Sequence, residues 1–470
     1  MIRKDNLTLD KHFFIIFIFF LLLQPVIDVF TSLMAKGDSS ITLGLVIRVI
    51  MLVVILYYAL FVVSSKYKKH LIIYFVILGI YAVIYIVNAY LTKGSTFLLA
   101  EIKAFVKLIY YPVMLASMFC IFESKELYIT PEQTARPGIV YSILILAAII
   151  TGTSFLSYGP GIHGTAGWYY APNEIGAILT VLFPLLYFSL LRHYKSWPFY
   201  VVLPIYIVVC LWIGTKAPML GMMFTLGAAA LVYLIKLIFC GQKLRSVIVC
   251  VSSVLIALLI FLLLPLTPCG KNLNMHLKRT NVQGLADFFN IEDESKEEDE
   301  VKENDGDKKK SKKKDAANVI FSSRDKYLAK VAKDYSDDST LTKFIGKGFV
   351  MDDLSTEEIE YVSVEMDFFD VFFRLGIIGT VIYMTPMIAL IVILLVSFFK
   401  KPLAFFDDEP FGLILALLLS VCLAAIAGHV ITAPAVSTYV VVLFVSLYVY
   451  QKKKIHCNIP KECPSADTKS

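Results

Sequence analysis

Charged residues are scarce in this sequence. Asp, Glu, Lys and Arg make up 17% of its 470 residues, whereas hydrophobic residues make up 58%. The mean hydropathy is +0.72. A water-soluble domain cannot bury this much apolar surface, because even folded domains leave much of their surface to water. The composition therefore excludes a soluble globular protein and indicates a polytopic membrane protein.

Cysteine is also scarce, and its positions exclude a disulfide-stabilised domain. Of the eight cysteines, only Cys269 belongs to the long polar segment that follows residue 267; the others fall in or beside apolar runs or in the C-terminal tail. A lone cysteine in that segment cannot form an intramolecular disulfide framework. The tail pair Cys457 and Cys463 lacks a recognised zinc spacing, so we predict no metal and no cofactor.

Long apolar runs predict an all-α fold of about twelve transmembrane helices. Each run is close to the roughly 20 residues that cross a hydrocarbon core of about 30 Å. The runs are continuously apolar and do not alternate as barrel strands would. The predicted spans are residues 12–35, 41–63, 70–91, 101–122, 138–156, 174–191, 197–213, 217–239, 246–267, 374–399, 410–428 and 434–450.

These spans divide the chain into four segments. Spans one to nine occupy residues 1–267, a long loop covers 268–373, spans ten to twelve occupy 374–450, and a tail covers 451–470. The middle of the long loop, about 291–316, is dense in charge, so we predict that it is disordered.

Short-loop basic residues set the predicted orientation, because Lys and Arg are enriched on the cytoplasmic side. The loops 36–40, 92–100, 157–173 and 429–433 are poor in both. The basic clusters are Arg3/Lys4/Lys11, Lys66/Lys68/Lys69, Arg192/Lys195, Lys243/Arg245, Lys400/Lys401 and Lys452/Lys453/Lys454. With an even number of spans, we predict that both termini are cytoplasmic and that the long loop is outside.

Several ionisable residues fall at one depth, near the outer ends of the predicted spans. Charges in membrane spans are costly and indicate a functional site. The cations are Arg48, Lys103, Lys107, Lys216 and Arg374, and Asp28, Glu174 and His429 lie at a similar depth. A set of cations suits an anionic lipid headgroup, above all pyrophosphate. The alternatives are that the cations extend to the membrane interface and that Asp28 is a structural counter-ion for one of them.

A polar group precedes the sixth predicted span, in the stretch GWYYAPNEIG that begins at Gly167. Asn173 is expected to cap this helix and Glu174 to lie in its first turn, where the helix dipole favours an acid. The functional alternative is that the helix N-terminus faces the pyrophosphate or a sugar. We therefore include Trp168, Asn173, Glu174 and His429 as candidate glycan-binding residues.

Three stretches resemble one family, the O-antigen ligases and Wzy-type polysaccharide polymerases. They are GTAGWYYAPNEIGAILTVLFPLL (164–186), IGTKAPMLGMMFTLG (213–227), and IGKGFV (345–350) followed by EMDFFDVFFRLGIIG (365–379). The resemblance implies a GT-C-like fold in the bacterial plasma membrane. It also implies metal-independent, inverting transfer of a glycan from an undecaprenyl-pyrophosphate carrier at the outer face.

Two residues depart from the family pattern. Lys216 stands where the family usually has Arg, which keeps the charge but loses bidentate recognition. Glu365 stands where the ligases typically have a loop His, and a carboxylate is a plausible general base toward a sugar hydroxyl. We predict Glu365 or Asp367 as the catalytic base, with Asp370 as a rival. The alternative for Asp370 is an ion pair with Arg374, its i+4 neighbour.

The sequence therefore predicts a polymerase that joins undecaprenyl-pyrophosphate-linked repeat units into a cell-surface polysaccharide. Its expected partners are that lipid-linked glycan, membrane lipid, a flippase and a chain-length regulator, and we predict no nucleic acid. Ligase-type transfer to another acceptor, a secondary transporter and an assembly scaffold are the alternatives. No repeat relates the two halves, and the charges lie at one face of the membrane, which argues against a transporter.

Overall fold

The computed structural model describes residues 4–37, 42–125, 127–159, 161–193, 195–239, 243–279, 324–351, 360–361, 364–400 and 405–456. The segment predicted to be disordered, about 291–316, lies outside these residues. The tail cysteines Cys457 and Cys463 also lie outside them.

Eleven of the described helical segments are long and apolar enough to cross a membrane. They are built from α1 (Lys4–Lys36), α2 (Leu43–Tyr57) with the π-helix η1 (Tyr58–Val62), α3 (Lys68–Lys93), α4 (Ser95–Lys125), α5 (Pro131–Ile150), α6 (Pro172–Arg192), α8 (Lys216–Phe239), α9 (Lys243–Leu263) with the 3₁₀ turn η2 (Leu264–Leu266), α15 (Asp367–Lys400), α16 (Asp408–Ile426) and α17 (Pro434–His456). The shorter apolar helix α7 (Trp197–Trp212) corresponds to the seventh predicted span. The prediction of an all-α polytopic membrane protein is confirmed.

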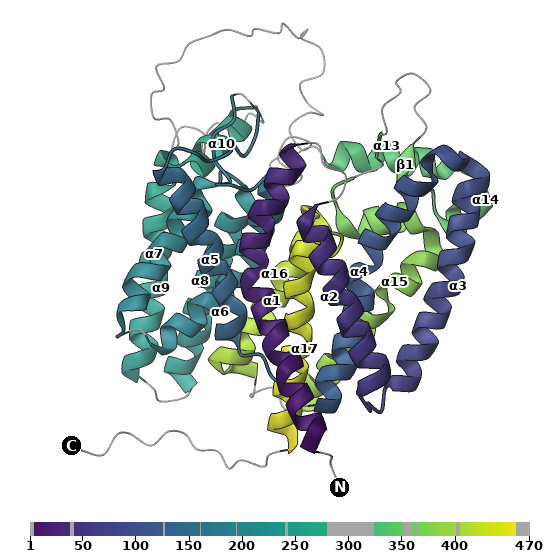
Figure 1. Cartoon of the computed structure of the whole chain (residues 1–470). Helices are drawn as coiled ribbons and strands as arrows, with labels where there is room; N and C mark the ends of the chain where they lie inside the picture. Colours follow the sequence, from purple (N-terminus) through teal and green to yellow (C-terminus); the bar gives the residue numbers. More distant parts are fainter. Residues whose placement is uncertain are drawn as a thin grey trace, which may run out of the picture.

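The bundle has two different ends (Figure 1). One end carries α10 (Pro268–Arg279), α13 (Arg324–Asp337), α14 (Thr340–Ile345) and β1 (Val350–Met351), which pairs antiparallel with β2 (Glu360–Tyr361). We call this the loop end. Helix α1 begins and helix α17 ends at the opposite end, which we call the terminal end.

The predicted spans at α5 and α15 begin seven residues after the observed helix starts. Helix α5 begins at Pro131, not at 138, because Thr130 and Gln133 form a capping box at its start. It ends at Ile150, before the turn at Gly152. Helix α15 begins at Asp367, not at 374, and is interrupted at Gly376, which has φ 64° and ψ −172°. The seven extra residues of α15 place Asp367 and Asp370 in the first turn of a membrane helix.

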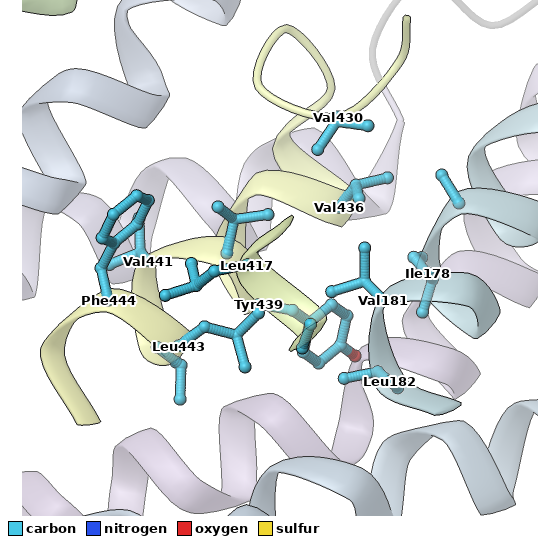
Figure 2. Close-up of a cluster of buried hydrophobic side chains, with 14 of the residues drawn as sticks. Ile178, Val181, Leu182, Leu417, Val430, Val436, Tyr439, Val441, Leu443 and Phe444 are labelled. Atoms are coloured by element: carbon cyan, nitrogen blue, oxygen red, sulfur yellow. The ribbon is translucent and has the colours of Figure 1, made fainter. Parts of the chain in front are cut away.

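The centre of the bundle is formed by α6 and α17. In the most apolar part of each helix, 89% of the residues are buried. Their sequences are apolar on every face, as expected for helices surrounded by other helices. Figure 2 shows Ile178, Val181 and Leu182 of α6 beside Val436 and Tyr439 of α17. The loop-end terminus of α6 is thus supported by the most deeply buried part of the protein.

Ion pairs join the helices at the terminal end. Asp408, in the first turn of α16, contacts Lys236 of α8 at 2.8 Å and Arg245 of α9 at 2.9 Å. Its neighbour Glu409 contacts Arg192 of α6 at 3.1 Å. Acidic residues at a helix N-terminus also interact favourably with the helix dipole, so α16 is fixed to three other helices here.

Candidate active site

The first turn of α6 opens onto the loop end, and its cap differs from the prediction. Ala171 is the N-cap and Pro172 is the first helical residue, so Asn173 lies inside the first turn and the expectation that it caps the helix was wrong. Proline suits this position because its missing N–H would have had no intrahelical partner. The side chain of Asn173 therefore does not cap the helix. Its Oδ1 accepts a hydrogen bond from Tyr158 Oη at 3.2 Å.

The loop before α6 folds back on itself. Leu156 and Thr165 form an antiparallel bridge, and Ser157 Oγ donates to the carbonyl of Ile213 at 2.6 Å. Trp168 is half-buried, and its Nε1 donates to Thr153 Oγ1 at 2.8 Å. Burial raises the pKa of Tyr158 to about 12, although the nearby positive charge of Arg324 acts to lower this pKa.

Asn272 of α10 connects this loop to the turn before α8. Its Nδ2 donates to the carbonyls of His163 at 2.6 Å and Gly214 at 3.0 Å, and its Oδ1 accepts from His163 N at 2.9 Å. The side chain is buried. Sequence reasoning missed this residue, because one polar residue on an amphipathic helix gives no signal of its partners.

Lys216 is the first residue of α8 and is half-buried. It lies within electrostatic reach of Arg324 and Cys269. The preceding residue, Thr215, is buried, and its hydroxyl has no hydrogen-bond partner among the described residues. Two cations and a buried hydroxyl therefore gather at a helix N-terminus, an arrangement that favours anions.

Arg324, at the start of α13, forms an ion pair with Glu365 at 2.8 Å. The Arg324 side chain is 13% exposed and that of Glu365 is 49% exposed. Sequence reasoning missed Arg324, because it is close to the charge-dense run and outside every apolar span. The structure brings it to the residue that was predicted as a base.

Asp367 is held differently. Its Oδ1 accepts from His429 N at 2.8 Å and Thr432 Oγ1 at 2.6 Å. Its Oδ2 accepts from the amides of Val430 and Ile431, both at 2.7 Å. The residue is 1% exposed, so the rival candidate for the base is surrounded by donors from one loop.

Glu365 and His429 share an uncommon backbone geometry. Their φ values are 58° and 60°, and they are the only non-glycine residues with positive φ in the described part of the chain. Such conformations cost free energy and cluster at functional sites. The half-buried His429 also lies within electrostatic reach of Asp370.

Arg374 forms the ion pair with Asp370 that the i,i+4 spacing suggested, at 3.5 Å. Its guanidinium also lies 5.3 Å from the ring centroid of Phe349, which is a cation–π geometry. Asp370 in turn accepts from the amide of Val364 at 2.8 Å. Asp370 thus links Arg374 to Val364, the residue before Glu365.

Glu101 of α4 fixes the segment that carries Phe349. It is 1% exposed and accepts from Phe349 N at 3.0 and 3.1 Å and from Tyr85 Oη at 2.6 Å. Lys93 supplies the counter-charge. Sequence reasoning missed this acid as well.

Arg48 does not join these groups through any described contact. Its guanidinium pairs with Asp28 and donates to Gln24 Oε1 at 3.1 and 2.8 Å. Asp28 also accepts from Tyr141 Oη, and Glu174 lies within electrostatic reach of it. Both members of the pair are buried. The alternative that Asp28 is the counter-ion of a predicted cation is confirmed.

Lys103 and Lys107 are exposed on α4, and neither has a hydrogen bond or an ion pair among the described residues. They share a helix stripe with Tyr110, whose hydroxyl contacts Thr438 of α17 at 3.1 Å. The five predicted cations therefore occupy four surroundings, and no described contact joins them into one site.

The helices and these contacts define a multi-pass membrane protein with ionisable side chains at the loop end, among them those on the first turns of α6, α8 and α15. A sequence profile described as "O-antigen ligase like membrane protein" matches residues 10–454. The chain belongs to this family, and membership supports a function in glycan transfer from a lipid-linked substrate in the membrane. No curated protein and no solved structure matches the chain.

Proposed function

We propose that this protein is a polymerase of the bacterial plasma membrane. It joins undecaprenyl-pyrophosphate-linked repeat units into a cell-surface polysaccharide, by inverting transfer without a metal ion. Both termini are in the cytoplasm and the loop end faces outward. A flippase supplies the lipid-linked units, and a chain-length regulator limits the product.

In the proposed reaction, Glu365 is the general base. An acceptor hydroxyl attacks the anomeric carbon of the donor glycan as the bond from that carbon to the pyrophosphate oxygen breaks. The hydroxyl proton passes to Glu365, and the lipid pyrophosphate leaves as an anion. Half-exposure of the Glu365 side chain, 49%, gives an acceptor access to it.

Arg324 and Lys216 bind the pyrophosphate in this scheme and stabilise the charge that develops on the leaving group. The observation that carries the proposal is the ion pair of 2.8 Å between Arg324 and Glu365, within electrostatic reach of Lys216. A cationic site directly beside a half-exposed carboxylate provides a leaving-group site next to a base. The Thr215 hydroxyl, which has no partner in the part of the chain that the structure describes, and the α8 N-terminus add donors.

The other predicted residues take supporting roles. Lys103 and Lys107, exposed on α4, attract the anionic headgroup from the membrane side, and Arg374 stabilises the segment before α15. Asn173, Glu174, Trp168 and His429 contact sugars. Arg48, which is already neutralised by Asp28, stabilises the packing of α1 against α2.

The test is the length of the glycan in cells that carry single variants at normal membrane levels. Glu365→Gln, Lys216→Ala and Arg324→Ala are expected to abolish long polymer and to accumulate single lipid-linked repeat units. Arg136→Ala, which removes an exposed pair with Glu132, is the matched control. Long polymer in all three site variants would disprove the proposed site.

The same experiment separates a polymerase from a ligase. Loss of a ligase leaves polymer of normal length on the lipid carrier, whereas loss of a polymerase leaves single units. Normal glycan together with impaired uptake or export of a small solute would instead favour the transporter.

A further inference from the structure

Asp367 is the most heavily hydrogen-bonded carboxylate of the candidate site. Each of its two oxygens accepts two hydrogen bonds, from His429 N and Thr432 Oγ1 on one side and from Val430 N and Ile431 N on the other. A carboxylate offers about four lone-pair sites. Every one of them is occupied, so no position on Asp367 is left for an acceptor hydroxyl.

The four donors all belong to the loop between α16 and α17, and this loop also contacts Glu365. A Cβ atom on Gly428 would lie 2.5 Å from the carbonyl oxygen of Glu365. Gly428 has φ 65°, so its backbone is pressed against Glu365 in a conformation that favours glycine. The loop that Asp367 binds therefore packs directly against the backbone of Glu365.

The strained residues lie on the two sides of this contact. His429, with φ 60°, donates its own amide to Asp367, and Glu365, with φ 58°, is two residues before Asp367. Such conformations persist only where the surroundings over-determine them. The hydrogen bonds to Asp367 are charge-assisted, which makes them about twice as strong as neutral ones, and they supply that restraint.

We propose that Asp367 is a positioning residue, which locks the loop 428–432 against the start of α15 and so holds Glu365 in its catalytic orientation. This inference rests on the proposed function, because it assigns the base to Glu365. We call the carboxylate of Asp367 with its four donors the Asp367 clamp. The Asp367 carboxylate acts on the orientation of the base and does not itself contact the substrate.

Thr432 offers the sharpest test, because its side chain contributes to the clamp and carries no candidate base. Thr432→Val removes one of the four hydrogen bonds and preserves the shape of the residue. Thr432→Ser keeps the hydroxyl and is the conservative rescue. Thr385→Val is the matched control, since it removes a hydroxyl whose one bond among the described residues is within its own helix, to the Val381 carbonyl at 2.7 Å.

The rate is measured with purified protein and with lipid-linked glycan extracted from Glu365→Gln cells as donor and acceptor. We expect Thr432→Val to lower kcat about tenfold, as for one hydrogen bond to a charged group, with KM within about twofold of the wild-type value. The shape of its pH profile is unchanged, because Glu365 is still the base. Thr432→Ser is expected to recover most of kcat, and Thr385→Val to match the wild type.

A second measurement does not depend on activity. Hydrogen exchange at the amides of His429, Val430 and Ile431 is expected to accelerate in Asp367→Asn, because the uncharged amide is a weaker acceptor and presents two N–H donors of its own. Unchanged exchange at these amides overturns the clamp.

The outcomes distinguish the inference from the function. A wild-type kcat in Thr432→Val overturns the clamp while the proposed function stands. Loss of activity in Asp367→Asn together with a wild-type kcat in Thr432→Val means that Asp367 is itself the base, and this also overturns the inference. A wild-type rate in Glu365→Gln disproves Glu365 as the base. That result is a failure of the proposed function and is distinct from the results that overturn the clamp alone.

Discussion

Gly346 and Gly376 lie in direct backbone contact, where the segment before β1 meets the break in α15. A Cβ atom on Gly376 would lie 2.5 Å from Gly346 N, and one on Gly346 would lie 2.1 Å from the carbonyl oxygen of Arg374. Both glycines have positive φ, 106° and 64° in chain order. The contact joins two glycine-containing stretches of the family resemblance, which are 30 residues apart in the numbering.

The first prediction concerns Gly376→Ala. An alanine here must adopt a left-handed backbone and overlap with Phe344 and Gly346. We expect the free energy of unfolding to fall by about 3 kcal/mol, measured by thermal or denaturant unfolding of the protein in detergent. Gly79→Ala is the control, since no atom of the described residues lies within 4 Å of a Cβ at that position of α3. Equal stability of the two variants would contradict the packing described.

The second prediction concerns the buried pair of Arg48 and Asp28. Arg48→Ala leaves the Asp28 carboxylate buried without its counter-charge, so we expect the free energy of unfolding to fall by about 4 kcal/mol. Arg136→Ala removes an exposed pair with Glu132 and is expected to cost at most about 0.5 kcal/mol. Both values come from the same unfolding experiment.

The double variant Arg48→Gln/Asp28→Asn then separates stability from substrate binding. Both charges are removed together, so the unpaired charge of the single variant does not arise. If Arg48 is structural, polymer length recovers in the double variant together with stability. Recovered stability with short glycan would instead return Arg48 to the pyrophosphate site.

The membrane helices were predictable because each one is determined by its own local sequence. A run of about 20 apolar residues has few options other than to span the bilayer, and all twelve predicted runs correspond to helices. At α5 a capping signal, Thr130 with Gln133, starts the helix before the apolar run, and at α15 a helical segment precedes the break at Gly376.

The candidate site was predictable only where its contacts are local. Asp370 and Arg374 are one helical turn apart, so their pair follows from spacing. Glu101 and Phe349 are separated by 248 positions, and Arg48 and Gln24 by 24. Charge at a common depth indicated that Arg48 is important and offered Asp28 as a counter-ion for one of the cations, but it did not identify Arg48 as the cation that Asp28 neutralises.

The third prediction tests how Asn272 positions Lys216. Asn272→Asp is nearly isosteric and keeps an acceptor for His163 N, but it loses the donor to the carbonyls of His163 and Gly214. We expect a loss of about 3 kcal/mol in the free energy of unfolding and faster hydrogen exchange at Thr165, whose amide bonds to the carbonyl of Trp212. Lys278→Ala, at an exposed position of the same helix, is the control.

The exchange data decide whether this effect is local. Faster exchange confined to the loop before α6 and to the turn before α8 indicates that Asn272 fixes these two segments. Uniformly faster exchange across the bundle would mean that Asn272 contributes only to global stability, with no particular effect on the position of Lys216.

The fourth prediction tests the orientation through thiol chemistry. Native Cys269 is 0% exposed, and burial raises the pKa of its thiol to about 12. A raised pKa keeps the thiol protonated at neutral pH, and only the thiolate reacts. Little thiolate is present at pH 8 and the side chain is buried, so Cys269 is expected to resist a membrane-impermeant maleimide added to intact cells.

New cysteines then report the side of the membrane, in a background with Cys457 and Cys463 changed to serine. Lys278→Cys, at the loop end, is expected to react in intact cells, whereas Lys66→Cys, at an exposed position of the terminal end, is expected to react only after permeabilisation. The reverse pattern would place the loop end in the cytoplasm. A lipid-linked glycan presented at the outer face could not then reach Glu365, and the proposed polymerase would be excluded even if every variant of the site were inactive.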